Sequence, residues 1–472
     1  MREAHVWRGP YWNEVCAKEI REQYIDFKEL VQTGVKYRKQ VRHFLAQMSR
    51  KYRYDHTEKS TSICNQLEVD ETDLYLLIHP NEMNHPFKYY FLKDELMNLL
   101  ERGHKEDWTD IYYSKKYLRH LKHCHARSIW AKFINRPLNQ KFLLEEGATF
   151  IAHWCGPDVS YTHIETQLDN ITQLVMDHLE IHCPTHPIFS VSQEEFSLWK
   201  HNNIYSDQWN YNDGIEILNI LRKIFFTILN FHVLNINDPR LFPENILINY
   251  VLERRVGISA SFAIIFHSVA RRLGLYCAPI FILCDNSKKN CMLRWKPKYD
   301  PNIQETWFII DILHNRVLKR PSMRFHVAKI NSTELLLALM KYLKTTCKNP
   351  NGDKLIEFKK SECMELHFLV QPEHLGNFCS LQQHHERMNM SLATVVTTLQ
   401  TITDTVGYNR NMRYFEALLE KLQNSEKKYQ VNTHIEPKKR IAGMRFAIGM
   451  VVIMDHSRAQ ATGLCKIGVI IG

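Results

Sequence analysis

A serine at the start of an expected helix is the first residue whose position could support chemistry. The stretch RRVGISASFAIIFHSVARRLG (254–274) places Ser259 just after Gly257, at the N-terminal end of a helix predicted for residues 259–273. Free backbone N–H groups and the helix dipole stabilise an anion there, which suits a nucleophile. Serine is also a common N-cap residue, and a cap at Ser259 or Ser261 would need no chemistry.

A serine hydroxyl becomes a good nucleophile only when a base lies beside it. In papain-like and transglutaminase-like enzymes the nucleophile begins a helix, a His comes from the first following strand, and an Asp comes from the next. Strand-like runs do follow here, at 278–284, 291–295 and 306–312. The expected His position, before the LRW letters, holds Asn290, which cannot take a proton, and only Asp311 remains.

The helix carries the letters of the transglutaminase-like pattern G-x-C-x-x-x-A-(x)-R-x-x-G except its cysteine, with a longer spacer of seven residues between Ala263 and Arg271. Ser259 stands in the place of the cysteine, and the other letters are Gly257, Ala263, Arg271 and Gly274. His267 lies on the same helix, but eight residues further on is about 12 Å at 1.5 Å per residue, too far to serve as the base. The sequence therefore predicts a catalytic fold that has lost catalysis, with Ser259 as a helix cap or a packed turn residue. No catalytic residue and no cofactor is expected.

Two other groups of residues could bind a metal ion. The run HLKHCH (120–125) places His120 one helical turn from His123 and Cys124, a spacing that can hold a metal. An exposed helix with surface histidines is the favoured interpretation. Cys277, Cys284 and Cys291 recur every seven residues but fall on expected strands and loops, where buried hydrophobic cysteines are the better explanation. No metal site is predicted.

Composition sets broad limits on the class of protein. The chain has 472 residues, enough for about three domains. Its net charge of +10 permits acidic partners without requiring them. The 12 cysteines form no CxxC pair, so a reduced protein of the cytoplasm or nucleus is expected. No apolar leader and no run of about 20 apolar residues is visible, so neither secretion nor membrane insertion is expected.

The pattern of elements predicts an α+β fold that is mostly helical. Residues 1–182 are predominantly helical in pattern, and the prolines of CPTHP (183–187) mark a boundary. Residues 188–320 show helices followed by β-branched and aromatic runs, which predicts an α+β domain with Phe266 and Trp295 in its core. Residues 321–436 return to a helical pattern resembling degenerate repeats, and residues 441–472 hold two strand-like runs.

The amino-acid sequence resembles the F-box only protein 21 family over much of its length. The resemblance is carried by KYYFLKDELMNLL, IYYSKKYLRHL, FLLEEGATFIAHWCGP, NYVLERRVGISASFAIIFHSVARRLGLYCAP and MLRW. It implies an F-box, a helical region (1–182), a transglutaminase-like domain without catalytic residues (188–320), a helical region (321–436) and the start of a hemimethylated-DNA-binding-like β domain (441–472). It further implies a non-catalytic substrate receptor of a cullin-type (SCF) ubiquitin ligase, which binds the ligase adaptor through its F-box.

Two departures from the family qualify this expectation. Almost none of the F-box is visible before VWRGPYW, and the C-terminal β domain is incomplete, so the 472-residue chain is expected not to co-purify with the adaptor. Whether it is a short paralogue or an incomplete gene model stays open. Two other functions also stay open: DNA binding through the tail, with weak support from Lys438, Lys439, Arg440 and Arg445, and an enzyme that uses Ser259.

Overall fold

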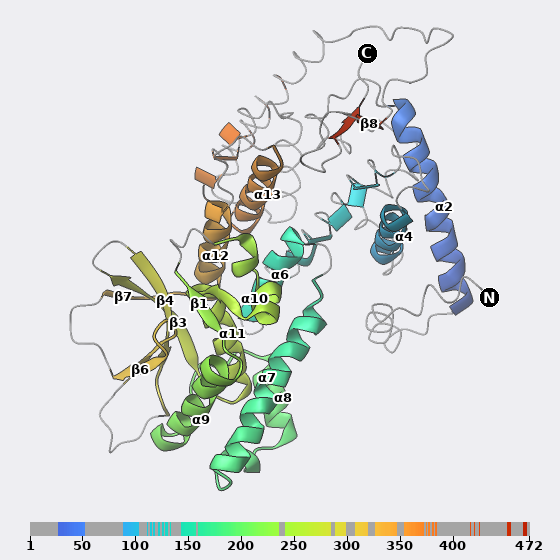
Figure 1. The fold of residues 1–472 in the computed structure, drawn as a ribbon. Coiled ribbons are helices and arrows are strands. Elements are labelled where there is room, and N and C mark those ends of the chain that lie inside the picture. The colour runs from blue at the N-terminus through green and yellow to red at the C-terminus, as the bar shows by residue number, and fades with distance from the viewer. Residues whose placement is uncertain are drawn as a thin grey trace, which may run out of the picture. The chain divides into compact units, whose positions relative to one another are not determined.

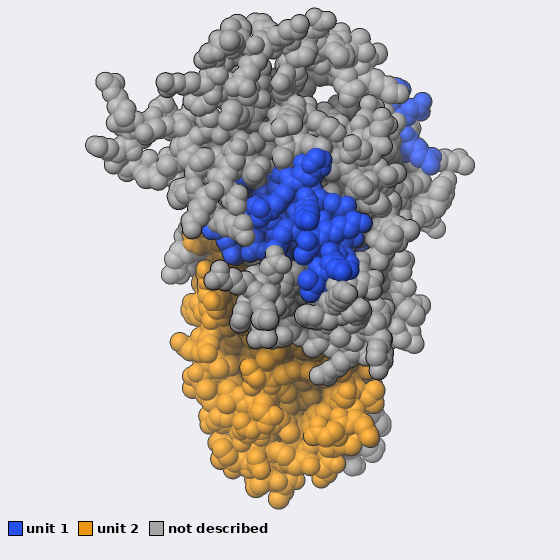
Figure 2. Space-filling view, turned by 90° about the vertical axis from the view of Figure 1, so that its right-hand side faces the viewer, with its two compact units in different colours: residues 1–129, 379–472 blue, residues 130–378 orange. Residues whose placement is uncertain are grey.

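The computed structural model describes two compact units, and each is considered by itself (Figure 2). One unit comprises residues 1–129 and 379–472, the other residues 130–378. The described residues are 27–51, 88–102, 143–156, 159–235, 241–284, 288–298, 307–319, 326–346, 354–371, 451–454 and 466–469, with scattered residues within 111–133 and 374–424. Among them, no helix is both long enough and apolar enough to cross a membrane.

The first unit is organised around two helices, α2 (Phe27–Lys51) and α4 (Lys88–Arg102). Val41, Phe44 and Leu45 of α2 are buried against Leu92 and Leu96 of α4, so these two helices share one apolar core. Arg38 and Arg42 both contact the buried carboxylate of Glu95 at 2.7 Å. The same unit contains an antiparallel pair, β8 (Val451–Met454) and β9 (Lys466–Val469), which agrees with the two predicted strand-like runs.

A five-stranded antiparallel sheet forms one layer of the second unit, in the order β6-β5-β4-β3-β7. The strands are β3 (Cys277–Cys284), β4 (Lys288–Trp295), β5 (Phe308–Asp311), β6 (Arg316–Lys319) and β7 (His326–Lys329). Three of them, β3 to β5, are the strands that the sequence predicted. The edge strand β7 lies in a stretch whose pattern was predicted to be helical. That prediction was wrong because residues 326–329 pair along β3, a long-range contact that local pattern does not encode.

The helix α11 (Ser259–Arg272) forms the centre of the second unit, between the sheet and an outer helical layer (Figure 1). Its 14 residues are all buried, because it contacts β3 and β4 on one side and helices on the others. Phe266 and Trp295 are both fully buried, as predicted. The helices around it are α6 (Leu144–Cys155), α7 (Tyr161–His182), α8 (Gln193–His201), α9 (Tyr211–Lys223) and α10 (Ile248–Arg254).

Short elements connect these helices and complete the unit. They are the 3-10 turns η5 (Pro187–Ser190) and η7 (Pro243–Asn245), the π-helical turn η6 (Ile224–Ile228), and a parallel pair of short strands, β1 (His232–Leu234) and β2 (Val256–Ile258). The helix α9 therefore ends at Lys223, and the chain continues through η6 into β1. Two further helices, α12 (Ser332–Thr346) and α13 (Lys354–Val370), follow the sheet and contact α6.

The two faces of the sheet have different environments. Trp295 and Phe308, a cross-strand pair, lie on the face covered by α9 and α11, since both rings contact Tyr211 of α9. On the opposite face a separate cluster contains Ile280, Ile282, Met292 and Ile309, with Trp307 and Leu318 packed against it. Side chains alternate between faces along a strand, so the face of each described residue in β4 and β5 follows from these assignments.

Candidate functional site

Ser259 is the first residue of α11, and it does not cap the helix. The N-cap is Ile258, whose side chain has no oxygen to offer the first N–H groups. The prediction of a cap at Ser259 or Ser261 was therefore wrong. Ser259 is only 5% exposed, and the hydroxyl of Ser261 donates to the carbonyl of Ile246 at 2.7 Å. The short strand β2 fixes Ile258 in extended conformation next to β1, which leaves the serines inside the first helical turn.

Gly257 has a packing role beside this turn. A Cβ atom at Gly257 would lie 2.8 Å from both Cγ atoms of Val251 and 3.1 Å from the carbonyl oxygen of Asn245. A side chain therefore does not fit where β2 passes over α10. The glycine of the transglutaminase-like pattern is explained here by close approach of the backbone, without a substrate.

The expected base and acid positions lie on β4 and β5. Asn290 is in β4, opposite Ile282 of β3. On the face of β4 that α9 and α11 cover, the residues are Cys291, Leu293 and Trp295, all buried and none able to act as a base at neutral pH. Asp311 ends β5, two residues after Ile309, and so lies on the opposite face with the Ile309 cluster.

The carboxylate of Asp311 is bound by residues of its own hairpin. Its side chain is completely buried, and it accepts hydrogen bonds from His314 Nδ1 and Arg316 Nε at 2.8 Å each and from the His314 backbone N–H at 3.3 Å. Those bonds hold the carboxylate in the turn after β5. The structure thus separates Ser259 and Asp311, which the sequence analysis had placed in one degenerate site, between the two sides of the sheet.

His267, the histidine of α11, is occupied elsewhere. Its Nδ1 contacts the carbonyl oxygen of Cys277 at 2.7 Å, so that nitrogen donates and the ring spans α11 and β3. Burial lowers the pKa of His267, and the hydrogen bond to Cys277 opposes this only in part. The buried imidazole thus joins α11 to β3 by a hydrogen bond. The sequence analysis excluded His267 as a base for Ser259 because of its distance along the helix, and this contact gives the ring a structural role instead.

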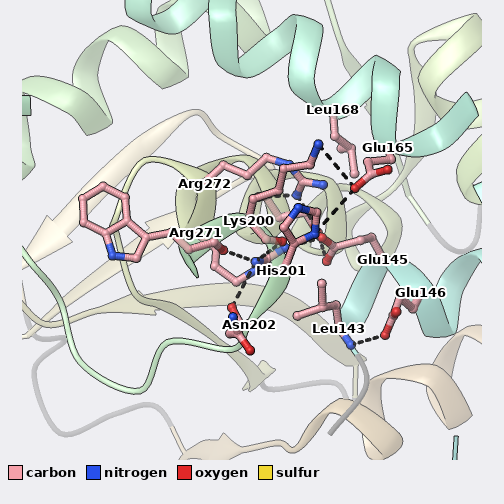
Figure 3. A network of polar contacts seen from close by, with 12 residues as sticks. Leu143, Glu145, Glu146, Glu165, Leu168, Lys200, His201, Asn202, Arg271 and Arg272 are labelled. Carbon is pink, nitrogen blue, oxygen red and sulfur yellow. Dashed lines mark hydrogen bonds and ion pairs between the residues drawn. The ribbon is translucent and has the colours of Figure 1, made fainter. Parts of the chain in front are cut away.

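The dominant polar feature of the second unit is a buried ion network centred on Glu145 (Figure 3). Glu145 of α6 is fully buried and contacts both Arg271 and Arg272 of α11, the latter at 2.8 Å. The hydroxyl of Ser268 also donates to Glu145, at 2.8 Å. Burial alone would raise the pKa of Glu145, but the two guanidinium groups lower it to about 2. Glu145 is therefore ionised at every physiological pH.

The same two arginines extend the network to the outer helices. Arg271 donates to the last carbonyls of α8, among them Lys200 at 2.7 Å and Asn202 at 3.1 Å, and also to Trp199. Arg272 contacts Asp169 of α7 at 3.0 Å. Each charge is matched by an opposite charge or a carbonyl dipole, so the network fixes four helices relative to one another.

A second buried carboxylate, Asp207, lies at the C-terminal end of β4, beside Trp295. It accepts hydrogen bonds from the Trp209 and Tyr276 backbone N–H groups and from Trp295 Nε1 at 2.8–3.0 Å. Burial raises the pKa of Asp207 to about 6, although these three donors oppose the shift. Its three donors come from the loop before α9, from the segment before β3, and from β4. Asp207 therefore joins these three parts of the chain by hydrogen bonds.

The residues considered for metal binding have different outcomes. Cys277 and Cys291 are buried, as predicted, and burial raises the pKa of both thiols. His120, His123 and Cys124 lie outside the described residues, as does the side chain of Cys284. Within the described part of the chain, no group of three or more His, Cys, Asp or Glu residues is arranged to hold a metal ion.

Comparison with known proteins finds a transglutaminase-like match over much of the second unit. Residues 162–342 match the family model of the transglutaminase-like superfamily. F-box only protein 21 of Pongo abelii is 27% identical over 207 residues, which is 43% of this chain and 31% of that protein. The Homo sapiens and Mus musculus proteins are also 27% identical over 207 residues, 43% of this chain and 30% of each relative. No solved structure matches the chain.

Over these 207 residues the chain is similar to F-box only protein 21. The resemblance noted in the sequence and the mostly helical α+β fold class are thereby confirmed. The alignment covers less than a third of the length of these curated relatives. The matched family model begins at residue 162 and the compact unit at residue 130, both earlier than the boundary predicted at 188, because α6 and α7 pack against α11. The domain boundaries drawn from the sequence stay predictions.

Sequence reasoning missed the residues that organise the site. Glu145 lies 126 residues before Arg271, and Asp207 lies 88 residues before Trp295. The only available signal for Glu145 was an acidic residue inside an otherwise apolar helix, GATFIAHWC following LLEE. In the sequence Arg271 was only a letter of the transglutaminase-like pattern, whereas the structure buries both Arg271 and Arg272 in an ion network.

Proposed function

We propose that this chain is a non-catalytic substrate-receptor component of a cullin-type (SCF) ubiquitin ligase. It recognises protein substrates through its transglutaminase-like domain and helical regions. The proposal is supported by its relatives, which are named as F-box proteins, and by the transglutaminase-like match over residues 162–342. The adaptor of the ligase is the proposed partner, through the F-box expected in the family. The cytoplasm or the nucleus is the proposed location.

The position of Asp311 is the observation that carries the non-catalytic part of the proposal. A transglutaminase-like mechanism needs the nucleophile, the base and the acid to converge on one side of the sheet. Here Asp311 lies on the face of the sheet opposite α11 and is held by His314 and Arg316. On the inner face, the position of β4 that pairs with the residue before Asp311 is occupied by Leu293. A serine without a base beside it is a poor nucleophile, which argues against the alternative of an acyl-transfer enzyme.

The rest of the unit is compatible with a domain that holds another protein. The Glu145 network ties α6, α7, α8 and α11 together, and the central helix is buried along its whole length. A rigid scaffold loses little conformational entropy when a partner binds. Any ligase activity would then reside in partner subunits.

DNA binding through the tail is the weaker alternative. The basic cluster Lys438, Lys439, Arg440 and Arg445 lies outside the described residues, and only the backbone of β8 and β9 is described in the tail. A short basic segment gives a salt-sensitive, sequence-independent affinity for any polyanion. Selective binding would require base contacts or a shaped surface beyond such a segment.

A gain-of-function fusion tests the receptor proposal. The full chain would be fused behind the F-box of human F-box only protein 21, and the fusion purified from cells with the adaptor and the cullin. Proteins captured by the chain are expected to gain ubiquitin in the fusion and to lack it when the F-box or the chain is expressed alone. Full recruitment of the adaptor without added ubiquitin on any captured protein would contradict the receptor proposal. The unfused chain tests separately whether its own N-terminal segment binds the adaptor.

A further inference from the structure

The turn between β5 and β6 presents two nitrogen-bearing side chains to solvent. His314 is 61% exposed and Arg316 is 54% exposed, while the carboxylate of Asp311 beneath them is fully buried. The His314 ring and the Arg316 guanidinium both contact the same carboxylate oxygen, Oδ2, at 2.8 Å. A single buried anion therefore brings an exposed imidazole and an exposed guanidinium together.

Several contacts hold this turn in one conformation. Asp311 pairs with Arg316 across the hairpin, and its other carboxylate oxygen accepts the His314 backbone N–H. Asn315 has φ of 49°, in the left-handed region that asparagine tolerates. From α9, Arg222 donates through Nε to the Asn315 side chain at 3.1 Å and also contacts the Asn315 carbonyl oxygen. The two exposed side chains are thus oriented before any ligand arrives.

The unused donors of the turn point to an anionic ligand. Asp311 takes Nδ1 of His314 and Nε of Arg316, which leaves the terminal nitrogens of the guanidinium as donors with no other partner among the described residues, while Nε2 of the ring donates only when the imidazole is protonated. Strand alternation places Arg294 and Trp307 on the same face of the sheet, with the guanidinium of Arg294 6.0 Å from the centre of the Trp307 ring. Arginine and tryptophan are the residues enriched at the centres of protein interfaces.

We propose that His314 and Arg316 bind an acidic segment of a polypeptide partner, with Arg294 and Trp307 further along the same face of the sheet. The oxyanion would be a carboxylate of Asp or Glu or a phosphate on a side chain of that segment. Planar guanidinium groups bind both in a bidentate manner. This inference rests on the proposed function, because it names the chemistry of the substrate segment that the receptor would hold. A single turn with one guanidinium and one imidazole fits one or two oxyanions of a peptide better than the continuous backbone of a nucleic acid, which needs a positively charged groove along its path.

Binding of charged peptides to the full chain tests the inference. The probes are a fluorescent peptide rich in Glu, its phosphoserine counterpart, its Gln counterpart and a short DNA duplex, each followed by anisotropy. The chain should bind the Glu or the phosphoserine peptide and discriminate against the Gln peptide, and the comparison of the first two identifies the oxyanion. Arg316→Gln combined with His314→Gln should weaken binding by roughly tenfold or more, because the charge-assisted hydrogen bonds of the guanidinium and the contact of the ring are lost.

Control variants keep the test independent of folding and of overall charge. Arg254→Gln removes an exposed cation of α10 that rests over Tyr250, and it should change the affinity by less than about twofold. Arg316→Lys retains the charge over Asp311 and should fold normally, yet lose part of the affinity with the bidentate geometry. Equal losses in Arg254→Gln and in the double variant, tighter binding of the duplex, or equal affinity for the Gln peptide would overturn the inference. These results leave the ubiquitin readout of the F-box fusion unaffected, so the two proposals can fail separately.

Discussion

Glu145→Gln should destabilise the second unit by about 3 kcal/mol or more. The carboxylate is completely buried, and it neutralises Arg271 and Arg272, whose side chains are 1% and 3% exposed. The difference between an ordinary pKa of 4.5 and the value of about 2 corresponds to about 3 kcal/mol, at about 1.4 kcal/mol per pH unit. Removing one partner of a buried ion pair typically costs about 3–5 kcal/mol, because the other charge stays buried without compensation.

The assay is a urea titration in which the unfolding of the second unit is followed by hydrogen exchange of the α11 amides. Glu180→Gln on the exposed surface of α7 is the matched control, with an expected change within about 0.5 kcal/mol. The sign of the pH dependence is also fixed. The pKa of Glu145 is depressed in the folded state, so its contribution is complete above the ordinary value of 4.5 and is lost as the pH falls toward 2. A loss below about 1 kcal/mol in Glu145→Gln would refute the view that this network holds the helices together.

Three further predictions concern the core around α11. Phe266→Ala should cost about 3–5 kcal/mol in the same titration, since Phe266 is fully buried, and a loss below 1 kcal/mol would mean that the helix presents another face. Gly214→Ala should cost about 1–3 kcal/mol, because the new Cβ would lie 2.5 Å from the ring of the buried Trp295. Gly156→Ala should be nearly neutral, because its new Cβ would lie 3.5 Å from the nearest atom. Equal losses of stability in the two variants would contradict this packing. Burial raises the pKa of Asp207 to about 6, so its stabilising contribution is present below the ordinary value of 3.8 and is lost as the pH rises through 6. The free energy of unfolding of the wild type, relative to that of Asp207→Asn, should therefore fall by about 3 kcal/mol between these two pH values. A constant difference would show that Asp207 does not titrate in this range.

Local pattern was sufficient for the elements that surround Ser259. The apolar stripe of Phe262, Phe266 and Val269 predicted α11, and the β-branched and aromatic runs predicted β3, β4 and β5. Periodicity also placed Phe266 and Trp295 in the core. These features depend on neighbours within one or two turns of chain, which is the range over which a single sequence is informative.

The site itself depended on long-range geometry. The helix cap was assigned to a serine because serine is the usual residue there, but pairing of β2 with β1 shifted the helix start so that Ile258 took the position. Strand register placed Asp311 on the outer face of the sheet, and spacing in the sequence could not show this. The pairing of Glu145 with Arg271 joins residues 126 apart, so no local pattern could have predicted it.

Labelling of the full chain with a fluorophosphonate probe tests the central claim of a non-catalytic transglutaminase-like fold most directly. Labelled residues would be located by mass spectrometry, in the wild type and in Ser259→Ala as the matched control. Because Ser259 is buried in the first turn of α11 and Asp311 lies on the other face of the sheet, labelling at Ser259 should not exceed the background. Stoichiometric labelling of Ser259 that disappears in Ser259→Ala would contradict the account.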